Sequence, residues 1–295
     1  MIKHRGVALV LVLAITGVLS LLILQISLTV RQQVSQAQRL TDRVEAELRL
    51  QSRESALLHS LLTRPKTTAP QPVVNGQSAV ENPYVTGWNF RGEPFFIDGA
   101  EIRLQDLNGL YPMTRAGPNP REFVRLLLAI GVDPVRADRI SKTLQAAVSS
   151  PPGLPLQAIG EIAAIPDLYA GEVDRLSEVA TLYPVGPLNP ATALEQVLAA
   201  RYEGSKLEGL LSTREAGALD EGRWTAITGD FSDDMSTTFL VGPGFRVDIT
   251  VAFRGVRLRR ESVWTIRPAS PDAPLELWAY RNRDPREAES SDNRE

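Results

Sequence analysis

Residues 1–30 read MIKHRGVALVLVLAITGVLSLLILQISLTV, and this stretch decides how the rest of the chain is organised. Lys3 and Arg5 precede Gly6, and no further charged residue occurs before Arg31. The apolar run of residues 7–30 is long enough to cross a bilayer, since about 20 apolar residues rising ~1.5 Å each span the hydrocarbon layer. Positive charge ahead of the run places the N-terminus in the cytoplasm by the positive-inside rule. We therefore expect a single-pass segment with the remaining chain outside the cytoplasm.

Three interpretations of this stretch compete. A cleaved secretory signal has a shorter apolar core of roughly 7–15 residues and a small-residue cleavage site, and no A-x-A triplet follows here. A plain uncleaved anchor fits the length and composition. In the third interpretation, the short basic leader ending at Arg5-Gly6 resembles the class III leader of type IV pilins and type II secretion pseudopilins. That resemblance implies a leader peptide of residues 1–6, cut by a prepilin peptidase between Gly6 and Val7.

The apolar run is predicted to continue into one long helix. Residues 31–63 contain neither Gly nor Pro and are rich in strong helix formers. Residues 7–64 then form a transmembrane segment and rod of roughly 55 residues, or ~80 Å, which ends at Arg64-Pro65 because the residue before proline leaves helical geometry. A narrow stripe recurs along the rod in steps of three and four; its members are Val30, Val34, Ala37, Thr41, Val44, Leu48, Ser52, Ser55, Leu58 and Leu62. As residues of the membrane and assembly helix we take Val7, Leu11, Gly17, Val30, Val34, Val44 and Leu48.

The overall composition excludes several classes of function. The chain has 295 residues, a net charge of −3, no cysteine and two histidines, His4 and His59, both in the leader or rod. A Ser–His–Asp triad, a Cys–His pair or a histidine-ligated zinc site is therefore excluded from the domain beyond the rod. The acidic balance argues against nucleic acid as a partner. We expect no enzymatic activity.

Beyond the rod, composition changes divide the chain into segments. Residues 65–83 carry four prolines without apolar periodicity and are predicted to be a linker. The remaining segments are the first part of a sheet domain (84–115), an inserted helical domain (116–213), the second part of the sheet domain (214–280) and a disordered charged tail (281–295).

Strand predictions occur on both sides of the helical block. Strands are expected within residues 84–97, at 100–106, at 224–227 and 237–241, at 245–253 and 256–266 around an Arg254-Gly255 turn, and at 275–280. The block between them begins a helix at Asn119-Pro120 and another at Asp133-Pro134, and Thr192 is expected to cap a later one. The predicted fold class is α+β: a pilin-like long N-terminal helix packed on an antiparallel sheet, with an all-helical domain inserted between strands.

Several segments in this order resemble the type II secretion minor pseudopilin K family, also called general secretion pathway protein K. They are RGVAL after the leader, DLNGLYPM at residues 106–113, LAIGVDPVRAD at 128–138, LQAIGEIAAIPDLYAGEVDRLSEVATLYP at 156–184, PLNPATALEQVLAA at 187–200 and the C-terminal hairpin. The family has a longer connection, with a Trp-x-Asp stretch, where this chain has only residues 148–155. The inserted domain is therefore expected to be smaller here.

The resemblance implies a function in secretion. It implies a minor pseudopilin at the tip of the periplasmic pseudopilus, initiating and capping assembly to support the export of folded proteins. The implied partners are other minor pseudopilins, the major pseudopilin, the prepilin peptidase and the inner-membrane assembly platform, with the chain held in the inner membrane. The alternative from another class is a single-pass, membrane-anchored periplasmic enzyme or binding module with an uncleaved anchor.

A cluster of acids is the candidate ligand site. Asp230, Asp233 and Asp234 lie in GDFSDDMS, and hard carboxylate oxygens at short spacing suit Ca²⁺, although the spacing is not that of an EF-hand loop. A solvated acidic loop and an acid/base pair for hydrolysis are the other interpretations. Calcium is accordingly the one cofactor considered.

Overall fold

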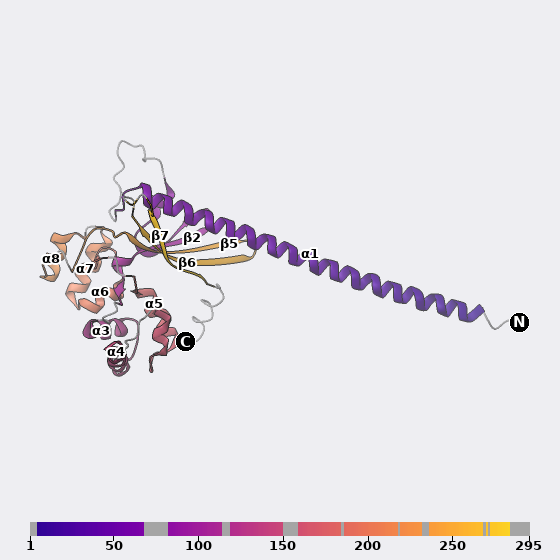
Figure 1. Ribbon diagram of the computed structural model, residues 1–295, viewed down its shortest axis with the longest axis horizontal. Coiled ribbons are helices and arrows are strands. Elements are labelled where there is room, and N and C mark those ends of the chain that lie inside the picture. Colours follow the sequence, from indigo (N-terminus) through magenta and orange to yellow (C-terminus); the bar gives the residue numbers. More distant parts are fainter. Residues whose placement is uncertain are drawn as a thin grey trace.

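The computed structural model describes residues 5–67, 82–113, 119–149, 159–183, 186–217, 219–231, 236–267, 270 and 272–283. One helix, α1 (Arg5–Thr63), runs from the N-terminal end into a compact head, and its first half projects freely from that head (Figure 1). Every described side chain from residue 11 to residue 41 is exposed, and the first buried one is Asp42. The predicted long N-terminal helix is confirmed, ending one residue before Arg64.

The head contains a five-stranded antiparallel sheet in the order β1-β2-β5-β6-β7. Its strands are β1 (Arg91–Ile97), β2 (Ala100–Asp106), β5 (Gly244–Phe253), β6 (Val256–Ile266) and β7 (Leu275–Arg283). β2 pairs with β5 from Ala100↔Val251 to Asp106↔Phe245, although more than a hundred residues separate them in sequence. The chain thus leaves the sheet after β2 and rejoins it beside the same strand, which confirms the predicted fold class.

α1 packs its second half across one face of this sheet. Ala46, Leu50, Leu57 and Leu61, at helical spacing, are each at most 1% exposed. Leu50, Leu57 and Leu61 share one core with a layer of apolar side chains from the central strands, which includes Ile102, Leu104, Phe245, Val247 and Ile249. Burying a side chain of this size contributes about 1.5–3 kcal/mol, so this layer fixes the helix on the sheet.

The insertion between β2 and β5 is mainly helical. It contains α3 (Pro120–Ala129), α4 (Pro134–Ser149), the 3₁₀ turn η2 (Ile159–Ala164), α5 (Ala170–Val179), α6 (Glu195–Arg201), α7 (Ser205–Glu215) and α8 (Glu221–Thr228). Two short parallel strands, β3 (Tyr111–Pro112) and β4 (Ala180–Thr181), join its beginning to its middle. Asn119 and Asp133 cap the first two helices through their side chains, as their Pro-containing starts predict. The insertion has its own apolar core around Phe123, Leu126 and Leu176.

Several predicted elements are wrong. The segment expected to start as a strand at residue 84 is instead helix α2 (Pro83–Gly87), because Asn82 caps it and Pro83 suits its first position. The expected strand at 224–227 lies in α8, which begins at the Asp220 cap and stops at Gly229 in the left-handed conformation. These start and stop signals outweigh the β propensity of Trp224, Thr225 and Ile227.

Two further predictions fail in the same region. The expected strand at 237–241 is only a single bridge from Thr237 to Leu188. The residue that caps α6 is Leu194 and not Thr192, whose hydroxyl is used elsewhere, as described below. The predicted linker lies mostly outside the described residues, as does the predicted disordered tail beyond Arg283, while residues 281–283 belong to β7.

Candidate functional site

The predicted assembly stripe of α1 is exposed over most of its length. The exposed fractions are 60% for Leu11, 50% for Val30, 63% for Val34, 59% for Val44 and 56% for Leu48. The sheet is covered instead by the line of Ala46, Leu50, Leu57 and Leu61, which the sequence analysis did not distinguish from the stripe. The rod therefore carries two apolar lines. The head buries the second line along its length, and the predicted stripe only near its end, where Leu58 is 6% exposed and packs in the same core.

The residues predicted to be the processing site lie at the free end of the same helix. Gly6 and Val7 fall in the first turns of α1, next to Arg5, where it begins. From Leu11 onward α1 is long and apolar enough to cross a membrane, and its most apolar window is entirely exposed. Apart from its two chain neighbours and the backbone of its own helix, no heavy atom lies within 4 Å of the position that a Cβ at Gly17 would take, so a neighbouring helix has unobstructed access there.

A buried polar cluster fixes α1 on β6. The Glu54 carboxylate accepts hydrogen bonds from the Ser262 hydroxyl at 2.6 Å and from the Trp264 indole N–H at 3.3 Å. Arg260 donates to Glu54 at 3.3 Å and also pairs with Glu47. Glu54 and Arg260 are only 7% and 5% exposed. The sequence signal for this cluster is an acid at a sheet-facing position of α1, four residues after Leu50; Glu54 was not among the predicted site residues.

A second buried cluster lies at the end of β2, in the DLNG turn. Asp106 is fully buried, and its carboxylate accepts from the backbone N–H of Asn108 at 3.0 Å and of Gly242 at 3.3 Å, and from the Thr192 hydroxyl at 3.0 Å. The Asn189 side-chain amide is a fourth donor, at 3.3 Å. Burial raises the pKa of Asp106 above its ordinary value, although these hydrogen bonds oppose the shift. The turn thus joins the sheet, the insertion and the strand that returns to the sheet.

The insertion lies very close to the DLNG turn. A Cβ on Gly109 would lie 2.3 Å from the carbonyl oxygen of Thr192, and the Gln105 amide also donates to that oxygen at 3.1 Å. On the neighbouring strand, the Arg246 guanidinium donates to the carbonyl oxygens of Ser177, Glu178 and Ala180, at the C-terminus of α5. A cation at this helix end is favoured by the helix dipole. The insertion is therefore held on the sheet by polar contacts at two places.

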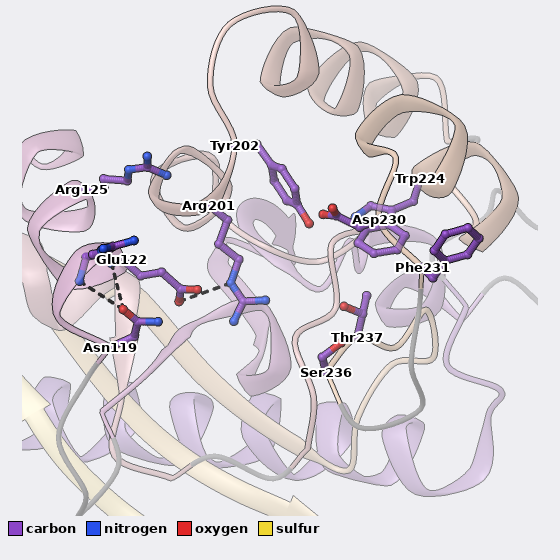
Figure 2. Close-up of a pocket in the computed structure, with 11 residues that line it drawn as sticks. Asn119, Glu122, Arg125, Arg201, Tyr202, Trp224, Asp230, Phe231, Ser236 and Thr237 are labelled. Carbon is purple, nitrogen blue, oxygen red and sulfur yellow. Dashed lines mark hydrogen bonds and ion pairs between the residues drawn. The ribbon is translucent and has the colours of Figure 1, made fainter.

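One cavity lies within the insertion, between α3, the end of α6, α8 and the loop after α8 (Figure 2). Its volume is about 530 Å³, and its lining is mainly charged and aromatic. Arg201 pairs with Glu122 at 3.5 Å across its floor, and Arg125 pairs with Glu203 at 3.0 Å. Phe231, 87% exposed, stands at its rim. The cationic groups of two lining arginines are thus already matched by carboxylates of the chain itself.

One residue of the predicted acid cluster, Asp230, lines this cavity. The Asp230 carboxylate points toward the Tyr202 hydroxyl (Figure 2), and burial followed by the charge of Asp230 raises the pKa of Tyr202 to about 12. Tyr202 is therefore protonated at neutral pH and acts as a donor. Asp233 and Asp234 lie outside the described residues. The structure thus gives Asp230 a protein partner, and calcium binding by the three acids stays a prediction.

Comparison with known proteins finds a likeness in structure. No protein-family model matches the chain, and no curated protein matches it. A solved structure does: a chain in the crystal structure of the GspK–GspI–GspJ complex from the type 2 secretion system of enterotoxigenic Escherichia coli, at 13% sequence identity and a TM-score of 0.51. The superposition covers 84% of this chain and 99% of that chain.

The chain has the fold of a type II secretion pseudopilin. The architecture implied by the sequence resemblance to the pseudopilin K family is therefore confirmed. At 13% identity the likeness concerns the fold. What the chain binds and where it acts are taken up next.

Proposed function

We propose that the chain is a minor pseudopilin of a type II secretion system, of the pseudopilin K kind. The observation that carries the proposal is the fold likeness over 84% of the chain, joined to an N-terminal helix whose apolar half is wholly exposed. A head domain on its own does not require an exposed apolar helix. A subunit of a fibre that assembles from the membrane requires this helix first as a membrane anchor and then as a surface that packs against other subunits. We infer an inner-membrane protein with its head in the periplasm and a structural role without catalysis.

The partners we propose follow from the same likeness. The similar structure is a complex of GspK with GspI and GspJ, so we infer that this chain assembles with the other minor pseudopilins of its own system. The exposed line of Val34, Val44 and Leu48 is the surface available for this. The major pseudopilin, the prepilin peptidase and the inner-membrane assembly platform complete the proposed set of partners.

We further propose that the chain occupies the tip of the pseudopilus, where it starts assembly and caps it. Most pilins of this type carry a glutamate at the fifth mature position, whereas the fifth residue counted from Val7 here is Leu11, and no acid precedes Asp42. A carboxylate within the membrane is costly unless paired, and a topmost subunit has no neighbour above to pair with it. The inserted domain also makes the head bulky on the side away from the membrane helix (Figure 1).

Copy number and position test this proposal. The tagged full-length chain, purified from detergent-solubilised membranes of cells making the whole system, should retain the other minor pseudopilins. Its own copy number in those cells should be far below that of the major subunit. Gold labelling of isolated fibres should mark one end only. Labelling along the whole fibre, at the abundance of the major subunit, would contradict tip placement, and purification without any pseudopilin would contradict the assignment itself.

Maturation gives an independent prediction. Gly6→Leu should leave the leader attached while the protein still enters the membrane, because a bulky residue before the cut obstructs a peptidase acting at the membrane face, whereas the apolar run is unchanged. N-terminal sequencing of the purified protein is expected to read from Val7 in the natural chain and from Met1 in the variant. Processing of the variant at the natural rate would rule out this cleavage site.

A further inference from the structure

The two flanks of the α1 rod differ in charge. On one flank, Asp42, Glu45, Arg49 and Arg53 recur at helical spacing, and three ion pairs hold them to one another and to the head: Arg49–Glu45, Arg53–Asp98 and Arg254–Asp42. The other flank is uncharged and exposed, and its members are Ala37, Leu40, Val44, Leu48, Gln51 and Ser55. We call this second set the uncharged flank.

The uncharged flank lies on the β6–β7 side of α1. At about 100° per residue, Glu47 lies roughly 60° round the helix from the sheet-facing Leu50, and Val44 roughly 120° in the same direction. Glu47 reaches Arg260 of β6. Moving round the helix past Glu47 therefore leads from the sheet-facing line, over β6, to Val44.

Edge strand β7 continues this apolar surface beside the helix. Tyr280 pairs with Ser262 and Leu277 pairs with Trp264, and paired residues of antiparallel strands point to the same face. Ser262 and Trp264 both donate to Glu54 of α1, so Tyr280 and Leu277 also lie on the α1 face of the sheet. They remain 50% and 45% exposed, since α1 lies over β5 and β6.

Arg260 joins the helix to this edge. Its guanidinium pairs with Glu47 and Glu54 of α1, and it stacks 5.0 Å from the centre of the Tyr280 ring. Tyr280 is therefore held close to the uncharged flank. The opposite edge strand, β1, is different: it contains Pro94, has an irregular register between Arg91 and Pro94, and is contacted by α2, which are features that protect an edge.

We propose that the uncharged flank of α1 together with Tyr280 and Leu277 of β7 binds the N-terminal helix of one neighbouring pseudopilin, lying parallel to α1. The proposal rests on the proposed function and adds which side of this chain the neighbour occupies. At about 100° per residue, none of the charged residues between Val30 and Ser55 falls on the uncharged flank: Arg39 and Arg43 lie on the sheet-facing line of α1, and Glu47 lies between that line and the flank. A helix inserted beside α1 in the same membrane therefore reaches Tyr280 when it runs along this flank.

The chemistry of the surface favours a helix over other occupants. A strand added to the edge of β7 would bind through backbone groups and would leave the side chains of the uncharged flank exposed. Apolar and small residues in steps of three and four match the ridges of a second helix. The charged flank, whose side chains are already paired, offers no comparable surface.

Site-specific photocrosslinking in the full-length chain tests the proposal. A benzophenone amino acid is placed at Tyr280 or Leu48, and, as matched controls, at Phe96 on the opposite edge, which is 72% exposed, or at Arg49 on the charged flank. After irradiation of cells making all the pseudopilins, Tyr280 and Leu48 should crosslink to the N-terminal helix of the same neighbour, and both controls should not. Because the chain has no cysteine, Tyr280→Cys gives a second probe, whose labelling by a maleimide should be lost when the neighbour is co-expressed.

The outcomes separate this inference from the function on which it rests. A crosslink from Leu48 to a pseudopilin without one from Tyr280, and with undiminished Tyr280→Cys labelling, leaves the proposed function in place and overturns the docking surface. Crosslinks from Tyr280 to a strand of another subunit, or to this chain itself, overturn it as well. Loss of all crosslinks from both positions, in a chain that still reaches the membrane, overturns both.

Discussion

Replacing Arg260 by alanine should destabilise the head by about 3 kcal/mol, because removing one partner of a buried ion pair leaves the other charge buried without compensation. Glu54, 7% exposed, would keep the Ser262 and Trp264 donors but lose its only cationic partner among the described residues. The contact of Arg260 with Glu47 and its stacking on Tyr280 would be lost as well. Urea unfolding of the detergent-solubilised full-length protein, followed by tryptophan fluorescence, measures the change.

The matched control is Lys142→Ala. Lys142 pairs with Asp138 at 2.6 Å on α4, but the two side chains are 75% and 55% exposed, so solvent screens the pair and its loss should cost no more than about 0.5 kcal/mol. Replacing Arg260 and Glu54 together by methionine should recover much of the loss, since a buried pair can be exchanged for apolar side chains at little cost. Equal effects of Arg260→Ala and Lys142→Ala would contradict the role assigned to Arg260.

The parts of the fold that could be predicted from sequence are those set by local signals. The rod follows from a run without Gly or Pro that stops before Pro65. The β5–β6 hairpin follows from two long β-rich runs around Arg254-Gly255, both at positive φ as a tight hairpin turn requires. The first helices of the insertion follow from the Asn119-Pro120 and Asp133-Pro134 starts.

The wrong secondary-structure predictions fall where the strand propensity of the residues disagrees with signals that mark the ends of a helix. Trp224, Thr225 and Ile227 favour a strand, yet Asp220 and Gly229 delimit a helix, and the helix is what forms. No individual helix was predicted at residues 205–215, although they include several strong helix formers and lie mostly within the predicted helical domain, and α7 forms there. Gly209 within α7 weakened that pattern, but in the structure it lies against Ile227 of α8, where a Cβ would come within 3.1 Å of that side chain.

The candidate sites were predictable only in part, because their geometry depends on pairing across the chain. The exposed stripe of α1 was identified from spacing, but spacing alone does not say which of two stripes meets the sheet. That choice is made by β6, whose Arg260 and Ser262 bind Glu54 more than 200 residues earlier. The role of Asp106 was likewise hidden, since its side-chain partners Asn189 and Thr192 are more than 80 residues away in sequence.

The second large effect is expected at Asp106, where alanine should cost about 2–4 kcal/mol, since a buried donor left without an acceptor costs roughly 1–3 kcal/mol. Two of its four donors have alternatives: the Asn189 amide also donates to the Leu240 carbonyl and the Thr192 hydroxyl lies 3.4 Å from the Asn189 carbonyl. The backbone N–H groups of Asn108 and Gly242 have no other recorded acceptor among the described residues. Loss of the hydrogen bonds to Asp106 would weaken the attachment of the insertion to the sheet, so proteolysis between residues 186 and 194 should accelerate. Asp138→Ala, in the exposed pair with Lys142, should change neither quantity.

The pH dependence of the unfolding free energy separates the effect of the Asp106 charge from the effect of the shape of its side chain. Burial raises the pKa of Asp106 in the folded protein, so the folded state binds this proton more readily than the unfolded state. Its contribution to the unfolding free energy is therefore fully present below the ordinary pKa of an aspartate and is lost as the pH rises through the raised value. Asp106→Asn keeps an acceptor but cannot titrate. The stability difference between the natural chain and this variant should thus shift in favour of the natural chain as the pH falls through that window, and a difference independent of pH would show that Asp106 has an ordinary pKa in the folded protein.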